Sequence, residues 1–339
     1  MSSTEASSDC SKERWRVKVS SNFLLYRNRA ITWSILTVVF ILTLIFGLHW
    51  TNLLLLTPLY FLVYMVWTVY RRVHPSRALS SFGFTPEMAD LQYREVTLNS
   101  RDGLRLNGWF IPRPGKASVI LAHGLGSSAS SLIFHAGFLA RAGYSVLLIN
   151  LRAHGKSQGR ISTFGVNEAN DILGALDYLH ARPSLDPRQV GALGVSLGAQ
   201  AVLRAAVQSD KLYCIVLEGL GASNLEDHGG SPTSLDHWIT YPINWLTYWI
   251  GDFMSGVRSP ESTCTMLRRL HCPVLLIASG GSNDSTFNRR FYEAANEPKS
   301  SWELPQAQHG GGLFFDREVY QKHVLEFFDM HLRGNGART

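Results

Sequence analysis

Ser196, at the centre of Gly194-Val195-Ser196-Leu197-Gly198, is the residue whose type and setting most suggest chemistry. An apolar run, 190–195, precedes the pentapeptide, and a run of small residues with helical character, 199–208, follows it. A serine at a sharp strand-to-helix turn projects its hydroxyl into a cleft, and flanking glycines let neighbouring elements come close. Because glycine and serine are common in this chain, the pentapeptide predicts a nucleophile only if its partners are found elsewhere.

A serine hydroxyl becomes a nucleophile when a base removes its proton and a third group orients that base. We predict that His309 is the base, in a loop that continues into three glycines and the last helix. Asp284, shortly after an apolar strand, is the predicted acid, although its position also suits a helix N-cap. Glu218, at the end of the preceding strand, is the alternative acid.

The negative charge of a tetrahedral intermediate must be met by fixed N–H donors. Leu197 follows the serine and opens a helix, so its backbone N–H is a predicted donor. Leu125, after His123-Gly124, is the second predicted donor. We predict a structural role for His123 and a loop-stabilising role for His154, since the site already has a base.

These residues need a scaffold that brings distant loops together. From residue 93 onward a predicted hairpin, 93–98 and 104–111, leads into apolar strands that alternate with helices. This alternation predicts a mostly parallel sheet covered by helices on both faces, with ligands bound beyond the carboxyl ends of its strands. The further predicted strands are 118–122, 145–150, 190–195, 212–217, 274–277 and 301–304, and the predicted helices are 131–142, 167–181 and 317–332.

An insertion, 224–264, interrupts this alternation and is dense in aromatic residues. A membrane span there would place the strand at 274 on the wrong side of the membrane from its sheet. We therefore predict a cap over the active site, with an ordinary packing helix as the alternative. The aromatic residues predicted to contact substrate are Trp238, Tyr241, Trp245 and Trp249, of which the last three share one helix face.

Charge and cysteine content narrow the possible functions. The net charge of +6 arises within residues 1–80, and residues 81–339 are neutral, which argues against nucleic-acid binding. The four cysteines lack zinc-binding spacing, and no nucleotide-binding motif is present, so we predict no metal and no cofactor. Free thiols are expected, with a Cys264–Cys272 disulfide as the alternative.

A stretch without charged residues, 30–70, predicts a membrane hairpin with spans at 30–48 and 53–70. Arginines 27, 29, 71 and 72 flank it, so both ends and the catalytic domain are predicted to be cytoplasmic. A hairpin that enters only one leaflet and a hairpin buried in protein are the alternatives. The predicted organisation is a basic tail at 1–29, the hairpin at 30–72, a linker at 73–92, an α/β domain at 93–333 with its cap at about 224–264, and a tail at 334–339.

Several motifs occur in a fixed order: His123-Gly124, the loop Arg152-Ala153-His154-Gly155, the Ser196 pentapeptide, a late acid and a final histidine. In this order the sequence resembles the α/β-hydrolase superfamily over about residues 90–333, and most of all the serine hydrolases grouped with monoacylglycerol lipases and proline-type aminopeptidases. The resemblance implies an α/β-hydrolase fold. The chain departs from the family where Arg-Ala-His-Gly replaces Arg-Gly-His-Gly, and where Ser279-Gly280 replaces His-Gly.

The predicted function is a membrane-anchored serine hydrolase that cleaves lipid or small acyl esters through an acyl-enzyme. Its predicted partners are the acyl substrate and the lipid bilayer, and the oligomeric state stays open. A peptidase or amidase and an acyltransferase on the same fold are alternatives. A membrane scaffold protein with an inactive hydrolase-like domain is another.

Overall fold

The structure, a computed structural model, describes residues 50–77, 84–229, 235–258 and 260–334. The chain divides into two compact units, Met1–Tyr64 and Met65–Thr339, and the boundary falls within helix α3 (Trp50–Val73). The second unit contains the sheet and every residue of the candidate site.

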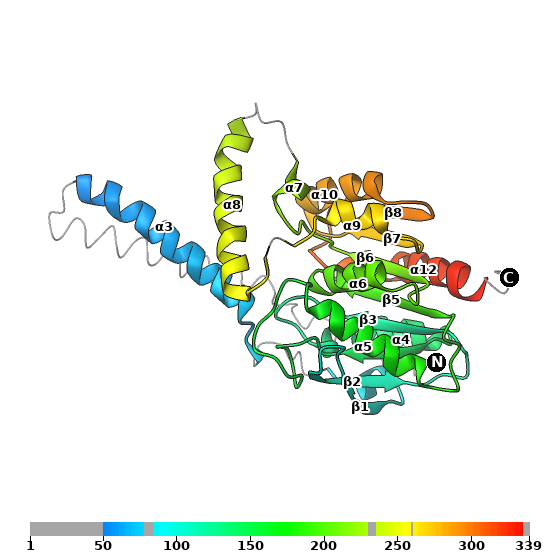
Figure 1. The fold of residues 1–339 in the computed structure, drawn as a ribbon. Helices are drawn as coiled ribbons and strands as arrows, with labels where there is room; N and C mark the ends of the chain where they lie inside the picture. The colour runs from blue at the N-terminus through cyan, green and yellow to red at the C-terminus, as the bar shows by residue number, and fades with distance from the viewer. Residues whose placement is uncertain (1–49, 78–83, 230–234, 259, 335–339) are drawn as a thin grey trace, which may run out of the picture. The chain divides into compact units, whose positions relative to one another are not determined.

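An eight-stranded sheet in the order β1-β2-β4-β3-β5-β6-β7-β8 forms the centre of this unit (Figure 1). The first two strands form an antiparallel hairpin, β2 also runs antiparallel to β4, and all other neighbours are parallel, which confirms the predicted mostly parallel sheet. The strands are β1 (Arg94–Asn99), β2 (Arg105–Ile111), β3 (Ser118–Ala122), β4 (Ser145–Ile149), β5 (Val190–Val195), β6 (Cys214–Glu218), β7 (Val274–Ala278) and β8 (Lys299–Glu303).

Helices cover both faces of the sheet (Figure 1). The interior strands β3 to β7 are buried along their whole length, and adjacent residues such as Ile120 and Leu121 belong to separate hydrophobic clusters on opposite faces. One cluster contains residues of α5 (Glu168–His180), α6 (Leu197–Gln208), α9 (Thr263–Arg269) and α10 (Gly281–Ala294). The other contains residues of α4 (Ile133–Arg141), α11 (Gly312–Phe315) and α12 (Arg317–Phe328).

Short helical turns account for the differences from the predicted helix boundaries. A 3₁₀ turn, Ala129–Leu132, precedes α4, and a π-helical turn, Asp329–Arg333, continues α12. Another 3₁₀ turn, Pro86–Ala89, precedes the first strand. The insertion between β6 and β7 contains α7 (Leu225–His228) and the long helix α8 (Leu235–Ser255).

Only part of the predicted membrane hairpin lies within the described residues. Its first span, 30–48, lies outside them, and its second, 53–70, lies within α3. Residues 50–52 of the predicted break at 49–52 are helical and form the first turn of α3. In the part of the chain with described structure, we find no helix whose length and apolar character suffice to cross a membrane.

The last turns of α3 pack within the second unit. Met65, Val69 and Val73 form a small buried cluster with Ile250 of α8. Phe164, from the loop before α5, is half-buried against the same cluster. This contact joins α8 to the loop before α5.

Candidate active site

Ser196 lies at the turn between β5 and α6, in a backbone conformation that residues other than glycine rarely adopt. Its φ is 54° and its ψ is −110°. Such strain persists where the surrounding packing enforces it. A Cβ atom at Gly194 would overlap the carbonyl of Gly198, and one at Gly198 would overlap the carbonyl of Ala122 in β3. Both glycines of the pentapeptide are therefore required by close backbone packing.

The structure brings Ser196, His309 and Asp284 together. His309 Nε2 lies 2.9 Å from Ser196 Oγ, and His309 Nδ1 lies 2.6 Å from Asp284 Oδ2. The side chain of His309 is 50% exposed and that of Asp284 is 17% exposed. The N-cap of α10 is Gly280, so the Asp284 carboxylate, in the first turn, is turned toward the histidine. At Gly219 (φ 62°) an added Cβ would lie only 2.8 Å from the His309 ring.

The electrostatic setting favours proton uptake by His309. The hydrogen bond to the Asp284 carboxylate raises the pKa of the imidazole, and partial burial opposes this effect. A histidine with a raised pKa is a stronger proton acceptor, provided that it is neutral at the working pH. The arrangement can therefore accept the proton of the Ser196 hydroxyl.

Glu218, the alternative acid, is fully buried and its carboxylate contacts other groups. It accepts hydrogen bonds from the Ser279 hydroxyl (2.6 Å), the Gly312 N–H (2.8 Å) and the Tyr320 hydroxyl (2.7 Å). Its backbone carbonyl accepts the N–H of Ser196 at 2.8 Å. Glu218 thus supports the serine turn and the loop after His309, while Asp284 occupies the position next to the imidazole.

The two predicted backbone donors, at Leu125 and Leu197, line the cavity beside Ser196. Leu197 is the first residue of α6, where backbone N–H groups have no partner within the helix. The loop of Leu125 is tied by His154, whose Nε2 accepts the N–H of Gly126 at 3.1 Å. The structure therefore places both predicted donor residues at the site.

His123 and His154, the two loop histidines, act as neutral hydrogen-bonding groups. Burial lowers the pKa of His123 to about 3 and also lowers the pKa of His154. His123 Nε2 accepts the N–H of Leu151 at 3.1 Å, and its Nδ1 lies 2.8 Å from the Gly124 carbonyl. These contacts agree with the structural roles predicted for the two residues.

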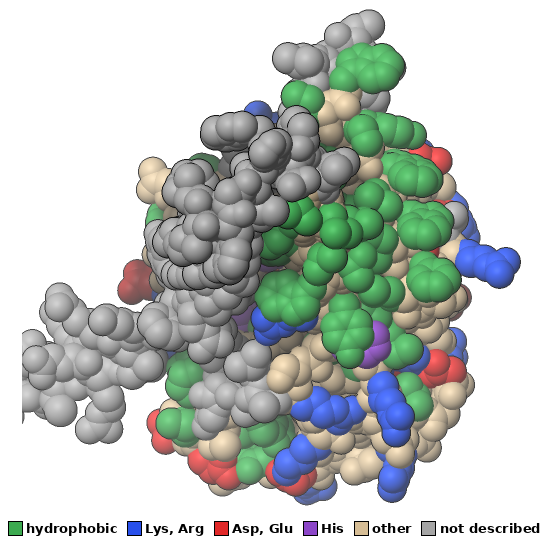
Figure 2. All heavy atoms as spheres, turned by 90° about the vertical axis from the view of Figure 1, so that its left-hand side faces the viewer, with side chains coloured by type: hydrophobic (Ala, Val, Ile, Leu, Met, Phe, Trp, Pro, Cys, Tyr) green, Lys and Arg blue, Asp and Glu red, His purple; other side chains and the backbone are tan. Residues whose placement is uncertain are grey.

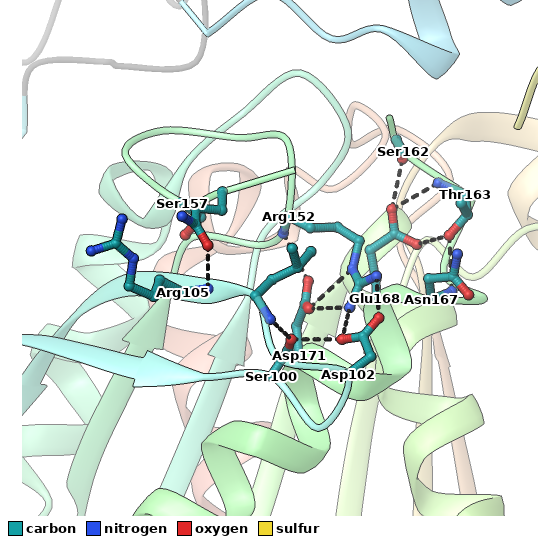
Figure 3. Close-up of polar contacts among 12 residues, drawn as sticks. Ser100, Asp102, Arg105, Arg152, Ser157, Ser162, Thr163, Asn167, Glu168 and Asp171 are labelled. Carbon is teal, nitrogen blue, oxygen red and sulfur yellow. Dashed lines mark hydrogen bonds and ion pairs between the residues drawn. The ribbon is translucent and has the colours of Figure 1, made fainter. Parts of the chain in front are cut away.

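Sequence reasoning missed a charged network beneath the loop after β4 (Figure 3). Arg152 donates from Nη2 and Nε to Asp171 Oδ1 (2.7 and 3.0 Å) and from Nη1 to Asp102 Oδ2 (2.8 Å). Nearby, Glu168 accepts hydrogen bonds from Ser162, Thr163 and Gly165. Acidic residues on the buried face of the predicted helix 167–181 were the available signal. The network fixes the loops that carry His154 and Phe164.

A cavity of about 400 Å³ opens beside Ser196 and His309. Its wall is completed by Val69 and Arg72 of α3, the loop around Phe164, the start of α6 and one face of α8. From α8 the lining residues are Asn244, Thr247, Tyr248, Gly251, Asp252 and Ser255.

The four aromatic residues of α8 that are predicted to contact substrate lie outside this cavity. Trp238, Tyr241, Trp245 and Trp249 are 70%, 46%, 51% and 55% exposed, and none of them lines this cavity. Figure 2 shows hydrophobic side chains gathered on one face of the molecule. The helical spacing was correct, but spacing alone does not determine which face of a helix turns inward. The cavity instead receives the more polar face of α8.

Cys214, Cys264 and Cys272 are free thiols, so the alternative Cys264–Cys272 disulfide is not formed. Within the described ranges, no cluster of three histidine, cysteine or acidic residues has the arrangement needed to hold a metal ion.

Comparisons with known proteins agree with this architecture. An uncharacterised protein of Mycobacterium tuberculosis is 29% identical over 240 residues, which cover 69% of this chain and 78% of that protein. The alpha/beta hydrolase domain-containing protein WAV2 of Arabidopsis thaliana is 27% identical over 262 residues, which cover 74% and 83% of the two chains.

Solved structures share the fold. The Pyrococcus furiosus esterase Pf2001 superposes with a TM-score of 0.61 at 24% identity, over 77% of this chain and 100% of that chain. A dienelactone hydrolase from Anabaena variabilis superposes with a TM-score of 0.52 at 22% identity, over 71% and 99% of the chains. A model of the Alpha/beta hydrolase family matches residues 119–321, more than half of the sequence. The chain therefore belongs to the alpha/beta hydrolase family.

Proposed function

We propose that this protein is a serine hydrolase that cleaves carboxylic esters through an acyl-enzyme. The observation that carries the proposal is the continuous contact from Ser196 Oγ through the His309 ring to the Asp284 carboxylate, with distances of 2.9 and 2.6 Å. Nucleophile, base and orienting acid stand in the order that this chemistry needs. Two relatives in fold, an esterase and a dienelactone hydrolase, are named for ester cleavage.

In the proposed reaction, His309 Nε2 takes the proton of Ser196 Oγ as the oxygen attacks the acyl carbon. The N–H groups of Leu125 and Leu197 bind the oxyanion, and Asp284 stabilises the imidazolium. The imidazolium then donates its proton to the departing alcohol, which leaves an acyl group on Ser196. Water, deprotonated by His309, attacks the acyl-enzyme and releases the carboxylic acid.

An aminopeptidase would need an acidic side chain in the cavity to hold the substrate amine, and among the described lining residues only Asp252 of α8 is acidic. Glu218 is buried and accepts three hydrogen bonds, and Glu226 lies on the exposed surface of α7. Neither residue lines the cavity beside Ser196. The similarity to monoacylglycerol lipases rests on the order of the sequence motifs and remains a prediction.

A fluorophosphonate probe tests the proposed nucleophile. The wild-type protein is expected to become labelled and to hydrolyse short p-nitrophenyl esters, and Ser196→Ala is expected to do neither. Ser209→Ala, at the far end of the same helix, is the matched control and is expected to behave as wild type. Labelling that persists in Ser196→Ala would exclude this serine as the nucleophile.

We further propose that the chain is held at a membrane with its catalytic domain in the cytoplasm. The uncharged segment 30–70 with arginines on both sides supports this, as do the exposed tryptophans of α8, because tryptophan favours membrane interfaces. The expected result is that the full chain stays in the membrane fraction after an alkaline carbonate wash. Release by that wash, or labelling of Cys10 in intact cells by an impermeant reagent, would contradict the proposal.

A further inference from the structure

Arg204 is a buried cation in the wall of the cavity that contains Ser196. It lies on α6 two turns after the serine, about 12 Å along the helix axis, and its exposed fraction is 6%. The same cavity is lined by Arg204, Gln200 and Ser196, which occupy one face of the helix at four-residue intervals. A charged side chain therefore faces the space in which an acyl chain or a leaving group would lie.

The hydrogen bonds of Arg204 leave most of its donors unused. Nη2 donates to Ser223 Oγ at 2.8 Å, and Nη1 donates to the Met266 sulfur, a weak acceptor, at 3.3 Å. Nε is buried, with no acceptor in the part of the chain that the structure describes. A guanidinium group has five N–H donors, so three of the five have no partner among the described residues.

No carboxylate of the described residues forms an ion pair with Arg204. The acids that act electrostatically on Arg204 are Glu261, Asp227 and Glu168, and each is engaged with other groups. Asp227 accepts the N–H groups of Ser223, Thr263 and Cys264, and Glu261 pairs with Arg269 at 2.8 Å. Glu168 is bound to the loop before α5. Burial lowers the pKa of Arg204, and these acids only partly offset that effect from a distance.

The described cavity lining contains two further charged residues, neither of which forms an ion pair with Arg204. Arg72, on α3, adds a second cation to the lining, and Asp252, on α8, adds one acid. His228, whose pKa is lowered by burial, bonds to the Tyr248 hydroxyl at 2.9 Å. A buried cation without a counter-ion is costly, and groups of this kind gather at functional sites.

We propose that Arg204 binds an anionic group, a carboxylate or a phosphate, carried by the ester substrate several bonds from the scissile carbonyl. This inference rests on the proposed esterase function and names its substrate class. Ser223 and Gln200 are positioning residues. The Ser223 hydroxyl donates to Gln200 Oε1 at 2.9 Å and accepts from Arg204, which orients the guanidinium from one side. The second N–H groups of Nη1 and Nη2 are then available for a bidentate contact with an anion, whereas Nε is enclosed.

The test compares kcat/KM for p-nitrophenyl monoesters of succinate, adipate and suberate with kcat/KM for the corresponding neutral methyl esters. A charge-assisted contact in a buried site predicts that the wild-type enzyme prefers at least one anionic ester by about tenfold or more. Arg204→Met is expected to abolish this preference, and Arg204→Lys to retain part of it.

Arg182→Met is the matched control. The Nε of Arg182 also lacks an acceptor within the described structure, but its guanidinium stacks on Phe110 and Tyr178 outside the cavity lining. The preference for the anionic ester is expected to be unchanged in this variant. Arg204→Met is also expected to raise Tm, because it removes an unpaired buried charge, whereas a purely structural arginine would lower Tm when replaced.

Two results would refute the anion site and leave the esterase proposal intact. In the first, the wild-type enzyme hydrolyses the neutral esters and shows no preference for an anionic ester. In the second, that preference is also found in Arg204→Met. Ligand binding to the Ser196→Ala variant is a second readout. It requires neither catalytic activity nor a folded Arg204→Met variant. Monomethyl suberate or inorganic phosphate, but not dimethyl suberate, should bind and raise Tm. Tighter binding of suberate or of phosphate identifies the source of the anion. Binding of neither anion refutes the inference, even if the protein proves not to be an esterase.

Discussion

Replacing Asp284 by Asn tests the roles of the two candidate acids most directly. The Asp284 carboxylate lies 2.6 Å from His309 Nδ1 and accepts a hydrogen bond from its N–H. The amide of an asparagine can donate to Nδ1 instead, which would move the imidazole proton to Nε2. His309 could then no longer accept the proton of Ser196 Oγ, which lies 2.9 Å away. We expect kcat to fall by about 10³–10⁴-fold, equivalent to about 4–5.5 kcal/mol of transition-state stabilisation.

Glu218→Gln is the matched control, because it removes the same charge from the same region. The two hydrogen bonds to Glu218 Oε1, from Ser279 and Gly312, can be accepted by a glutamine oxygen. The glutamine amide can donate to the Tyr320 hydroxyl in place of the third. We expect this variant to lose less than about tenfold in kcat, since the His309 contacts stay in place.

The pH profile adds a second readout of the same substitution. Because the Asp284 hydrogen bond raises the pKa of His309, the active neutral form is present above that pKa and is lost as the pH falls through it. The acidic limb of kcat/KM should therefore lie above the ordinary histidine pKa of about 6.5 in the wild type, and at lower pH in Asp284→Asn. Equal losses in the two variants, or an unmoved limb, would refute the assignment of Asp284.

Three other substitutions probe the surroundings of the site. Arg152→Met leaves Asp171 buried without its partner, so we expect the free energy of unfolding to fall by about 3–5 kcal/mol in urea titrations. His154→Ala removes the acceptor of the Gly126 N–H and loosens the loop of Leu125; we expect kcat to fall about tenfold with little change in KM, well below the loss of an oxyanion donor itself. The double variant Trp245→Ser/Trp249→Ser changes only exposed aromatic rings. It should keep kcat/KM for a short soluble ester within about twofold and weaken co-sedimentation with lipid vesicles; a large loss of activity would restore these rings to the substrate site.

Local patterns in the sequence were sufficient to predict the sheet, the nucleophile and the base. Uniformly apolar segments indicate strands buried on both faces, and the residues that follow such strands must meet at one edge of a parallel sheet. For that reason Ser196 and His309, 113 positions apart in the sequence, could be selected together with two candidate acids, Asp284 and Glu218. Each of these signals depends on a few neighbouring residues, which is why sequence alone carries them.

Only the tertiary structure decided which acid contacts the histidine and which face of α8 turns inward. Asp284 and Glu218 both follow strands, and the choice between them depends on how α10 begins and on the hydrogen bonds that occupy Glu218. The repeat of aromatic residues in α8 describes a face of the helix but not its neighbour. The isolation of Arg204 likewise depends on where every surrounding carboxylate is engaged. Each of these features depends on contacts between segments that are distant in the sequence, so no local pattern of residues specifies it.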